Sequence, residues 1–162
     1  MRSSTRTPTD SPCLVEHQNG DPMALAVVVY DEAEAMECIA HAMSHTPLVR
    51  GEVTVIGIPR VPWLSKVGML SGHVVPAELT GEAERIASNA ARQAVQMLPA
   101  SAAGVHVVCD GWWDPALRAH LMRVRCDRLI VARHRLRTNG LLVHLTLRGT
   151  GIQVCAAGAE PR

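Results

Sequence analysis

One stretch of the chain, residues 104–132, has the pattern of a strand, a turn, a helix and a second strand. Residues 105–109 form a short apolar run rich in valine, which is typical of a buried strand in a parallel sheet. Asp114 stands where a helix N-cap is expected, and Pro115 takes the first helical position, where its missing N–H costs nothing. A second apolar run follows at 129–132. A strand, a crossover helix and a strand of these lengths predict a right-handed unit with parallel strands.

The rest of the chain continues this alternation of strands and helices. Apolar runs predict further strands at 25–29, 53–58 and 151–157, and apolar residues at helical spacing predict helices from 32 to about 45 and from 80 or 81 to 98. Residues 59–81 contain three Pro and three Gly and have the character of a long loop. We therefore expect an α/β protein, a three-layer sandwich around a five-stranded, mostly parallel sheet.

The chain has the size of one domain. Its 162 residues suffice to bury a core without metal or disulfide staples. Residues 1–22 are rich in Ser, Thr, Pro and Asp and hold little to bury, so we expect a disordered N-terminal tail followed by a single domain at 23–158.

Two structures compete for residues 139–149. Asn139 and Gly140 followed by alternating apolar residues fit a hairpin turn and a strand. The same residues fit a helix with Asn139 as N-cap and Gly149 as C-cap. We favour the helix, because a parallel sheet needs a crossover before the final strand.

Composition narrows the class of protein. No run reaches the roughly 18 apolar residues of a membrane span, and the N-terminus lacks the apolar core of a signal peptide. Five Cys without CxxC spacing argue against a secreted disulfide framework, and we expect a cytoplasmic protein. Residues 112–150 hold eight Arg against two Asp, but no aromatic residues are interleaved for stacking on bases. Nucleic acid is therefore a disfavoured partner.

Four stretches have a characteristic order and spacing: AVVVYDEAEA at 26–35, GWWDPALRAHLM at 111–122, CDRLIVARHR at 126–135 and GIQVCAA at 151–157. Together they resemble universal stress protein domains, whose fold is of the adenine nucleotide alpha hydrolase-like type. The resemblance covers residues 23–158 and rests on the order and spacing of all four. It implies a five-stranded parallel sheet with any ligand at the carboxyl edge between the first and fourth strands.

The resemblance also identifies candidate ligand-binding residues. Family members that bind ATP carry a Gly-x-x-Gly, nine residues, Gly-Ser/Thr pattern after the fourth strand, and its backbone amides hold phosphates. Here Ala132 stands in place of the first Gly and Arg135 near the second, while Asn139 and Gly140 remain of the final pair. We expect the phosphate cradle to be missing and no cofactor to be bound, with ATP as the one candidate.

Three further features at this edge are candidate ligand contacts. Asp31 ends the first strand, where the family places an Asp near the adenosine, but an N-cap for the helix at 32–45 is the simpler explanation. Arg133, His134, Arg135 and Arg137 can attract an anion by charge alone, although a solvated basic loop is the simpler interpretation. Trp112 and Trp113 follow the third strand, where they fit either a ligand contact or a cap on the edge of the sheet.

Other chemistry has weaker support. In the helix at 32–45 we expect the apolar face to consist of Met36, Ile39, Ala40 and Met43. The opposite face then carries Glu34, Cys38, His41 and His45, which fit a metal site or, more simply, a polar solvent-exposed face. No nucleophile has a convincing base and orienting partner, so we expect no enzyme and no metal.

Three functions are consistent with these observations. The first is a stress-response regulatory or scaffolding domain that does not bind ATP in the usual way, dimeric through its apolar last strand. The second is an atypical adenine-nucleotide-binding switch that uses Asp31, the arginines and the Trp pair. The third is a small enzyme of a related α/β fold. We favour the first.

Overall fold

The computed structural model describes residues 24–45, 52–60 and 77–158, and it contains one five-stranded sheet. The strands lie in the order β3-β2-β1-β4-β5, and each neighbouring pair is parallel. Their bounds are β1 Leu25–Val29, β2 Glu52–Gly57, β3 Ala103–Val108, β4 Arg128–Ala132 and β5 Gln153–Ala157. The predicted α/β class and the five-stranded sheet are confirmed. The predicted tail at 1–22 and most of the predicted loop at 59–81 lie outside the described residues.

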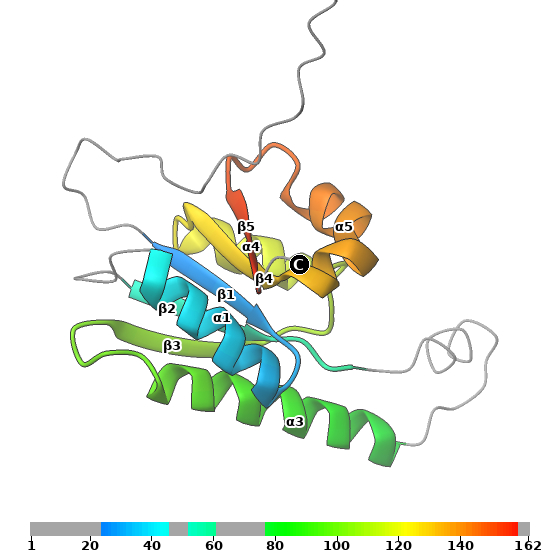
Figure 1. Ribbon diagram of the computed structural model, residues 1–162. Helices are drawn as coiled ribbons and strands as arrows, with labels where there is room; N and C mark the ends of the chain where they lie inside the picture. The colour runs from blue at the N-terminus through cyan, green and yellow to red at the C-terminus, as the bar shows by residue number, and fades with distance from the viewer. Residues whose placement is uncertain (1–23, 46–51, 61–76, 159–162) are drawn as a thin grey trace, which may run out of the picture.

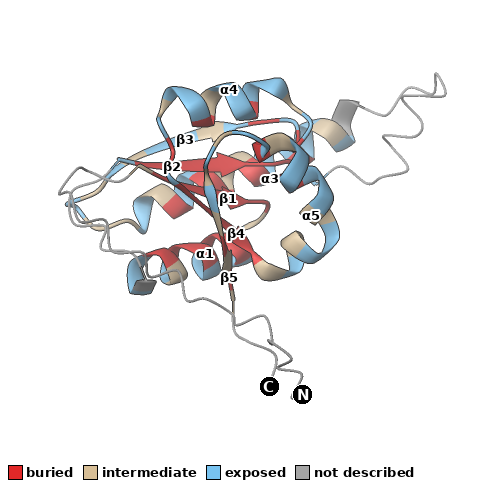
Figure 2. Cartoon of the chain, turned by 90° about the horizontal axis from the view of Figure 1, so that it is seen from above, coloured by how far each residue is buried: buried red, intermediate tan, exposed pale blue. Residues whose placement is uncertain are grey.

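Four helices of the described residues cover the sheet in two layers (Figures 1 and 2). They are α1 Glu32–His45, α3 Ala77–Gln96, α4 Pro115–Arg123 and α5 Arg133–Leu147. One core contains side chains of α1 and α3, and the other contains side chains of α4 and α5. β1 contributes side chains to both cores, because alternate residues of a strand point to opposite faces of the sheet. Val27 and Val29 face α1 and α3, whereas Val28 and Tyr30 face α4 and α5.

The start of α4 is as predicted. The Asp114 carboxylate accepts a hydrogen bond from the Ala116 amide at 2.8 Å, and Pro115 opens the helix. Leu117 and Leu121, one turn apart, are fully buried against the sheet. None of the described helices is long and apolar enough to span a membrane.

The prediction that the third strand is buried is wrong. β3 lies at an edge of the sheet, and its Val105 and Val108 side chains are 45% and 40% exposed. A run of β-branched residues favours a strand wherever it lies in the sheet, because that preference is local, whereas the order of strands depends on contacts far along the chain. The predicted start of α3 at 80 or 81 is also late, since the helix begins at Ala77.

The apolar face predicted for α1 is wrong in part. Ile39 is buried as predicted, but Ala40 is exposed, and Met36 and Met43 are more than half exposed. The other buried residues of the helix are Glu34, Ala35, Cys38 and Ala42. Small side chains let the helix approach the sheet closely, and the larger Met side chains then lie on the solvent side. This rotation of α1 also brings Glu34 toward β4 and α5.

Residues 139–147 are helical, as favoured, but the helix begins earlier than predicted, and its C-cap is Arg148, one residue before the predicted Gly149. α5 starts at Arg133, directly after β4, and Asn139 and Gly140 lie in its interior. Its N-cap is Ala132, whose side chain makes no capping hydrogen bond. The predicted N-cap at Asn139 is therefore wrong. Gly149, with φ +75°, lies just past the helix end, where a left-handed residue is common.

Gly57 is expected to be intolerant of a side chain. A Cβ there would lie 2.6 Å from the Ala87 carbonyl oxygen of α3, because strand and helix backbones meet closely. We predict that Gly57→Ala lowers the free energy of unfolding by about 1–3 kcal/mol, measured by urea denaturation. Gly140→Ala is the control, since open space surrounds Gly140 and a helix interior favours Ala by up to about 1 kcal/mol. Equal stability of the two variants would contradict this.

Candidate functional site

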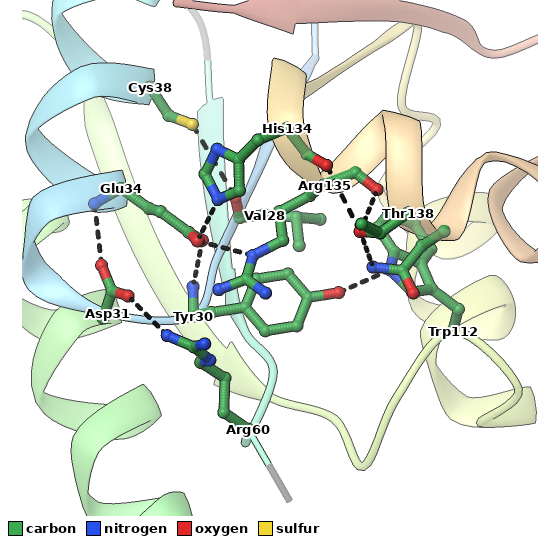
Figure 3. A network of polar contacts seen from close by, with 11 residues as sticks. Val28, Tyr30, Asp31, Glu34, Cys38, Arg60, Trp112, His134, Arg135 and Thr138 are labelled. Atoms are coloured by element: carbon green, nitrogen blue, oxygen red, sulfur yellow. Dashed lines mark hydrogen bonds and ion pairs between the residues drawn. The ribbon is translucent and has the colours of Figure 1, made fainter. Parts of the chain in front are cut away.

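The candidate site lies at the carboxyl ends of β1 and β4. After β1, the chain adds β2 and then β3 next to one edge of β1. It then crosses back and adds β4 and β5 next to the opposite edge of β1. β1 and β4 therefore flank the topological switch point, where open α/β sheets bind ligands. Side chains from the segments that follow these two strands meet at this edge (Figure 3).

Glu34 is the centre of this group of side chains. It lies in the first turn of α1 and is only 4% exposed. Its Oε1 accepts from Arg135 Nε at 2.6 Å and from His134 Nε2 at 2.9 Å, and its Oε2 accepts from the Tyr30 amide at 3.1 Å. A buried carboxylate needs such partners, because burial removes its hydration. Glu34 thus joins the end of β1 to the start of α5.

Arg135 covers the ring of Tyr30. Its guanidinium carbon lies 4.3 Å from the ring centroid, within the range of a cation–π contact. The Tyr30 hydroxyl accepts a hydrogen bond from Trp112 Nε1 at 2.6 Å. Burial raises the pKa of Tyr30 to about 12, and the Glu34 carboxylate adds to this rise, whereas the Trp112 hydrogen bond and the Arg135 charge oppose it.

Asp31 serves as the N-cap of α1. Its Oδ1 accepts from the Glu34 amide at 3.0 Å, and its Oδ2 lies 3.7 Å from Arg60 Nη1. Of the two roles predicted for Asp31, the structure shows the N-cap. Glu34 stands three residues after this cap, the spacing of a capping box, but its carboxylate accepts from the Tyr30 amide, one residue before the cap.

The structure brings together only part of the predicted ligand site. Ala132 ends β4, and Arg133 and Arg135 occupy the first turn of α5 at the same edge as Asp31. Asn139 and Gly140 are more than a turn further along α5, about 9 Å or more from Arg133 along the helix axis. The expected basic loop at 132–140 is therefore helical, and this is a correction to the sequence-based prediction.

The candidate metal ligands of α1 do not share a solvent-exposed face. Cys38 is buried, and its thiol donates to the Val28 carbonyl at 3.9 Å. Burial, with smaller contributions from Glu37 and Glu34, raises the pKa of the Cys38 thiol to about 12, which opposes the thiolate that a metal would need. In the part of the chain that the structure describes, no three His, Cys, Asp or Glu side chains are placed to hold a metal ion.

The two tryptophans differ in environment. Trp112 is 2% exposed and packs in the α4–α5 core, where its indole N–H is taken by Tyr30. Trp113 is 52% exposed and lies over Gly111, where an added Cβ would meet its ring at 2.6 Å. Trp112 therefore packs in the core and, through its hydrogen bond to Tyr30, contacts the residue that follows β1 at the edge of the sheet.

The ion pair between Glu34 and Arg135 was missed by the sequence analysis. The two residues are 101 positions apart, and each was assigned to a solvated segment. One local signal was present, since Asp31 and Glu34 have capping-box spacing and this fixes the turn of α1 on which Glu34 lies.

Known structures share the fold of this chain. No family model matches it, and no curated protein matches it. The crystal structure of the hypothetical protein PH0823 is 16% identical and has a TM-score of 0.55, covering 86% of this chain and 98% of that one. A universal stress protein from Archaeoglobus fulgidus is 12% identical with a TM-score of 0.42, covering 84% and 93% of the two chains. The universal stress protein from Archaeoglobus fulgidus in complex with dAMP is 13% identical with a TM-score of 0.45, covering 84% and 98%. At these identities the likeness is one of fold alone.

We expect loss of the Glu34 charge to be costly. In Glu34→Gln the Arg135 guanidinium, 15% exposed, keeps its place without a carboxylate. Removing one partner of a buried ion pair leaves an uncompensated charge, so the free energy of unfolding should fall by about 3 kcal/mol in a urea titration. Glu82→Gln, in the exposed pair with Arg85, is the control and should change stability little. A loss in Glu34→Gln as small as in the control contradicts the assignment.

Tyr30 offers a direct test of burial, because it is the only tyrosine. Its absorbance titration near 295 nm should have a midpoint near pH 12. The pKa in the folded protein lies above the ordinary value near 10, so the contribution of Tyr30 to the free energy of unfolding should be constant below pH 10 and be lost as the pH rises from 10 to 12. A midpoint near 10 in the folded protein means that the phenol is solvated.

Proposed function

We propose that this chain is a stress-response-associated regulatory or scaffolding domain of universal stress protein type that does not bind ATP in the usual way. One observation carries the proposal. At the switch point between β1 and β4 the chain pairs its own side chains, since Glu34 binds Arg135 and the Arg135 guanidinium lies over the Tyr30 ring. The sequence resemblance and the α/β fold support the family type.

The path of the chain after β4 also supports it. A glycine-rich phosphate cradle needs a backbone that leaves the strand as a loop and exposes its amides. Here β4 ends at Ala132 and α5 begins at Arg133. Side chains of His134 and Arg135 project from this first turn onto Glu34, in the place where a phosphate would approach the backbone.

A second candidate is an atypical adenine-nucleotide-binding switch. Asp31 is partly exposed at the same edge, its pair with Arg60 is long at 3.7 Å, and the N-terminus of α5 has no side-chain cap. Against this candidate, one Asp31 oxygen already caps α1. The third candidate, an enzyme, has less support, because Glu34 is neutralised by Arg135 and the buried thiols of Cys38, Cys109 and Cys126 have pKa values raised by burial.

A cytoplasmic homodimer is part of the same proposal. β5 is an edge strand that pairs with β4 on one side. No strand among the described residues pairs with its other edge, which offers backbone groups to a second copy. The proposed dimer joins two β5 strands across a two-fold axis.

Calorimetric titration with ATP separates the two main candidates. We expect no heat of binding up to millimolar ATP, and no nucleotide released on denaturing the purified protein. Micromolar binding that Asp31→Ala abolishes, and that Arg92→Ala on α3 leaves intact, favours the nucleotide switch and overturns the proposal. Because Asp31→Ala also removes a helix cap worth about 1 kcal/mol, its folding is checked by circular dichroism.

A further inference from the structure

Helix α5 has apolar residues on two opposite faces. Its inner face buries Val143 and Leu147 in the core with α4. On the other side Leu141 is 72% exposed, Leu145 is 52% exposed and Leu142 is 38% exposed. A surface helix ordinarily buries one apolar stripe and leaves a polar face to solvent. The outer leucines therefore form a surface that nothing in the described chain covers.

Positive charge flanks these leucines. Arg137 lies one turn before Leu141, and Arg148 follows Leu145 at the end of the helix, and both arginines are exposed. Neither α4 nor α5 contains an Asp or Glu. Arg118 of α4 donates to the Thr146 carbonyl of α5 at 3.2 Å, which adds a further arginine beside α5. We call Arg137, Leu141, Leu145 and Arg148 the basic leucine face. Its chemistry fits an apolar partner that carries negative charge.

The chain itself carries a surface of that kind on α1. Met36 is 59% exposed and Met43 is 51% exposed, and they lie on one side of the helix with Ala40 between them. Glu32 and Glu37 are exposed beside them, and α1 contains no Lys or Arg. We call Glu32, Met36, Glu37, Ala40 and Met43 the acidic methionine face. α1 has 14 residues and α5 has 15, so the two helices match in length at about 21 Å.

We propose that the basic leucine face of one copy binds the acidic methionine face of a second copy. A single molecule cannot make this contact, because α1 and α5 cover opposite faces of its own sheet (Figure 2). Contact between two α5 helices is disfavoured, since Arg137 and Arg148 of both copies would meet with no acid between them. Met side chains adapt their shape readily to leucine, which suits a surface of this type.

The geometry of the contact sets how it assembles. When the basic leucine face of one copy binds the acidic methionine face of the next, one face of each kind remains unbound at the two ends of the assembly. Further copies can therefore bind there, unless the assembly closes into a ring. Pairing through β5, in contrast, stops at two copies. One helix pair buries less than the roughly 800 Å² per partner of a stable interface, so the association is weak and depends on concentration and salt.

Charge reversal on each face gives a decisive test. The first variant is Glu32→Arg with Glu37→Arg, and the second is Arg137→Glu with Arg148→Glu. In either variant alone both faces carry the same sign, whereas in an equimolar mixture each face finds an opposite partner. The average mass of the full chain is measured by sedimentation equilibrium over a range of concentrations in low and high salt, and the folding of each variant is checked by circular dichroism.

For the wild type we expect the mass to rise with concentration in low salt and to lose this rise in high salt. For each variant alone, the association constant should fall at least about ten-fold. A tenfold fall corresponds to about 1.4 kcal/mol, and like charges that face each other across a contact cost more than this. The mixture should regain the association. Arg85→Glu with Arg92→Glu on α3 makes the same change in net charge outside both faces and should behave as wild type.

Three results overturn the proposal. They are a wild-type mass fixed at one or two copies at every concentration, a mixture no larger than its separate variants, and a control that loses association as the second variant does. A fixed dimer that none of the variants changes supports pairing through β5 instead. None of these results bears on ATP binding, so the failure of this contact is distinguishable from the failure of the proposal that the chain does not bind ATP.

Discussion

The buried carboxylate of Glu34 is the interaction on which this edge of the structure depends. It accepts hydrogen bonds from the end of β1, through the Tyr30 amide, and from the first turn of α5, through His134 and Arg135. Helix α1, which carries Glu34, lies on one face of the sheet, and α5 packs on the other. One side chain therefore connects both helical layers across the carboxyl end of β1. Because Glu34 is buried, its charge requires these donors, and their positions are fixed in turn.

Much of the fold could be predicted from local sequence. Apolar runs located the strands, and Asp114 with Pro115 located the start of α4, because capping is settled by neighbouring residues. The order of strands in the sheet depends on contacts between residues far apart in the sequence. The local pattern of β3 therefore predicts a buried strand, although β3 lies at an edge. On α1, helical spacing is compatible with two apolar stripes that share Ile39, one with Met36 and Met43 and one with Ala35 and Ala42. Hydrophobicity favoured the methionines, and close packing against the sheet selected the small residues.

The candidate site was predicted in place and only partly in content. Asp31 and Arg135 lie at the switch point (Figure 3), and Arg133 begins α5 directly after β4, because the ends of parallel strands meet at one edge of a sheet. What joins them there could not be found by spacing, since Glu34 and Arg135 are far apart in sequence. An isolated Glu on an amphipathic helix is ordinarily solvated, so its burial follows only from the rotation of α1 that the small residues impose.

The ambiguity of residues 139–149 and the exposed leucines of α5 have the same cause. Leu141, Val143, Leu145 and Leu147 alternate as in a strand, because the helix carries apolar residues on its outer face as well as on its buried one. A single apolar stripe at helical spacing would have predicted a helix alone. The polar outer face that solvent would favour is replaced by leucine flanked by arginine. Leu141 and Leu145 add nothing to the core that the described residues form, and the proposed contact with a second copy would bury them.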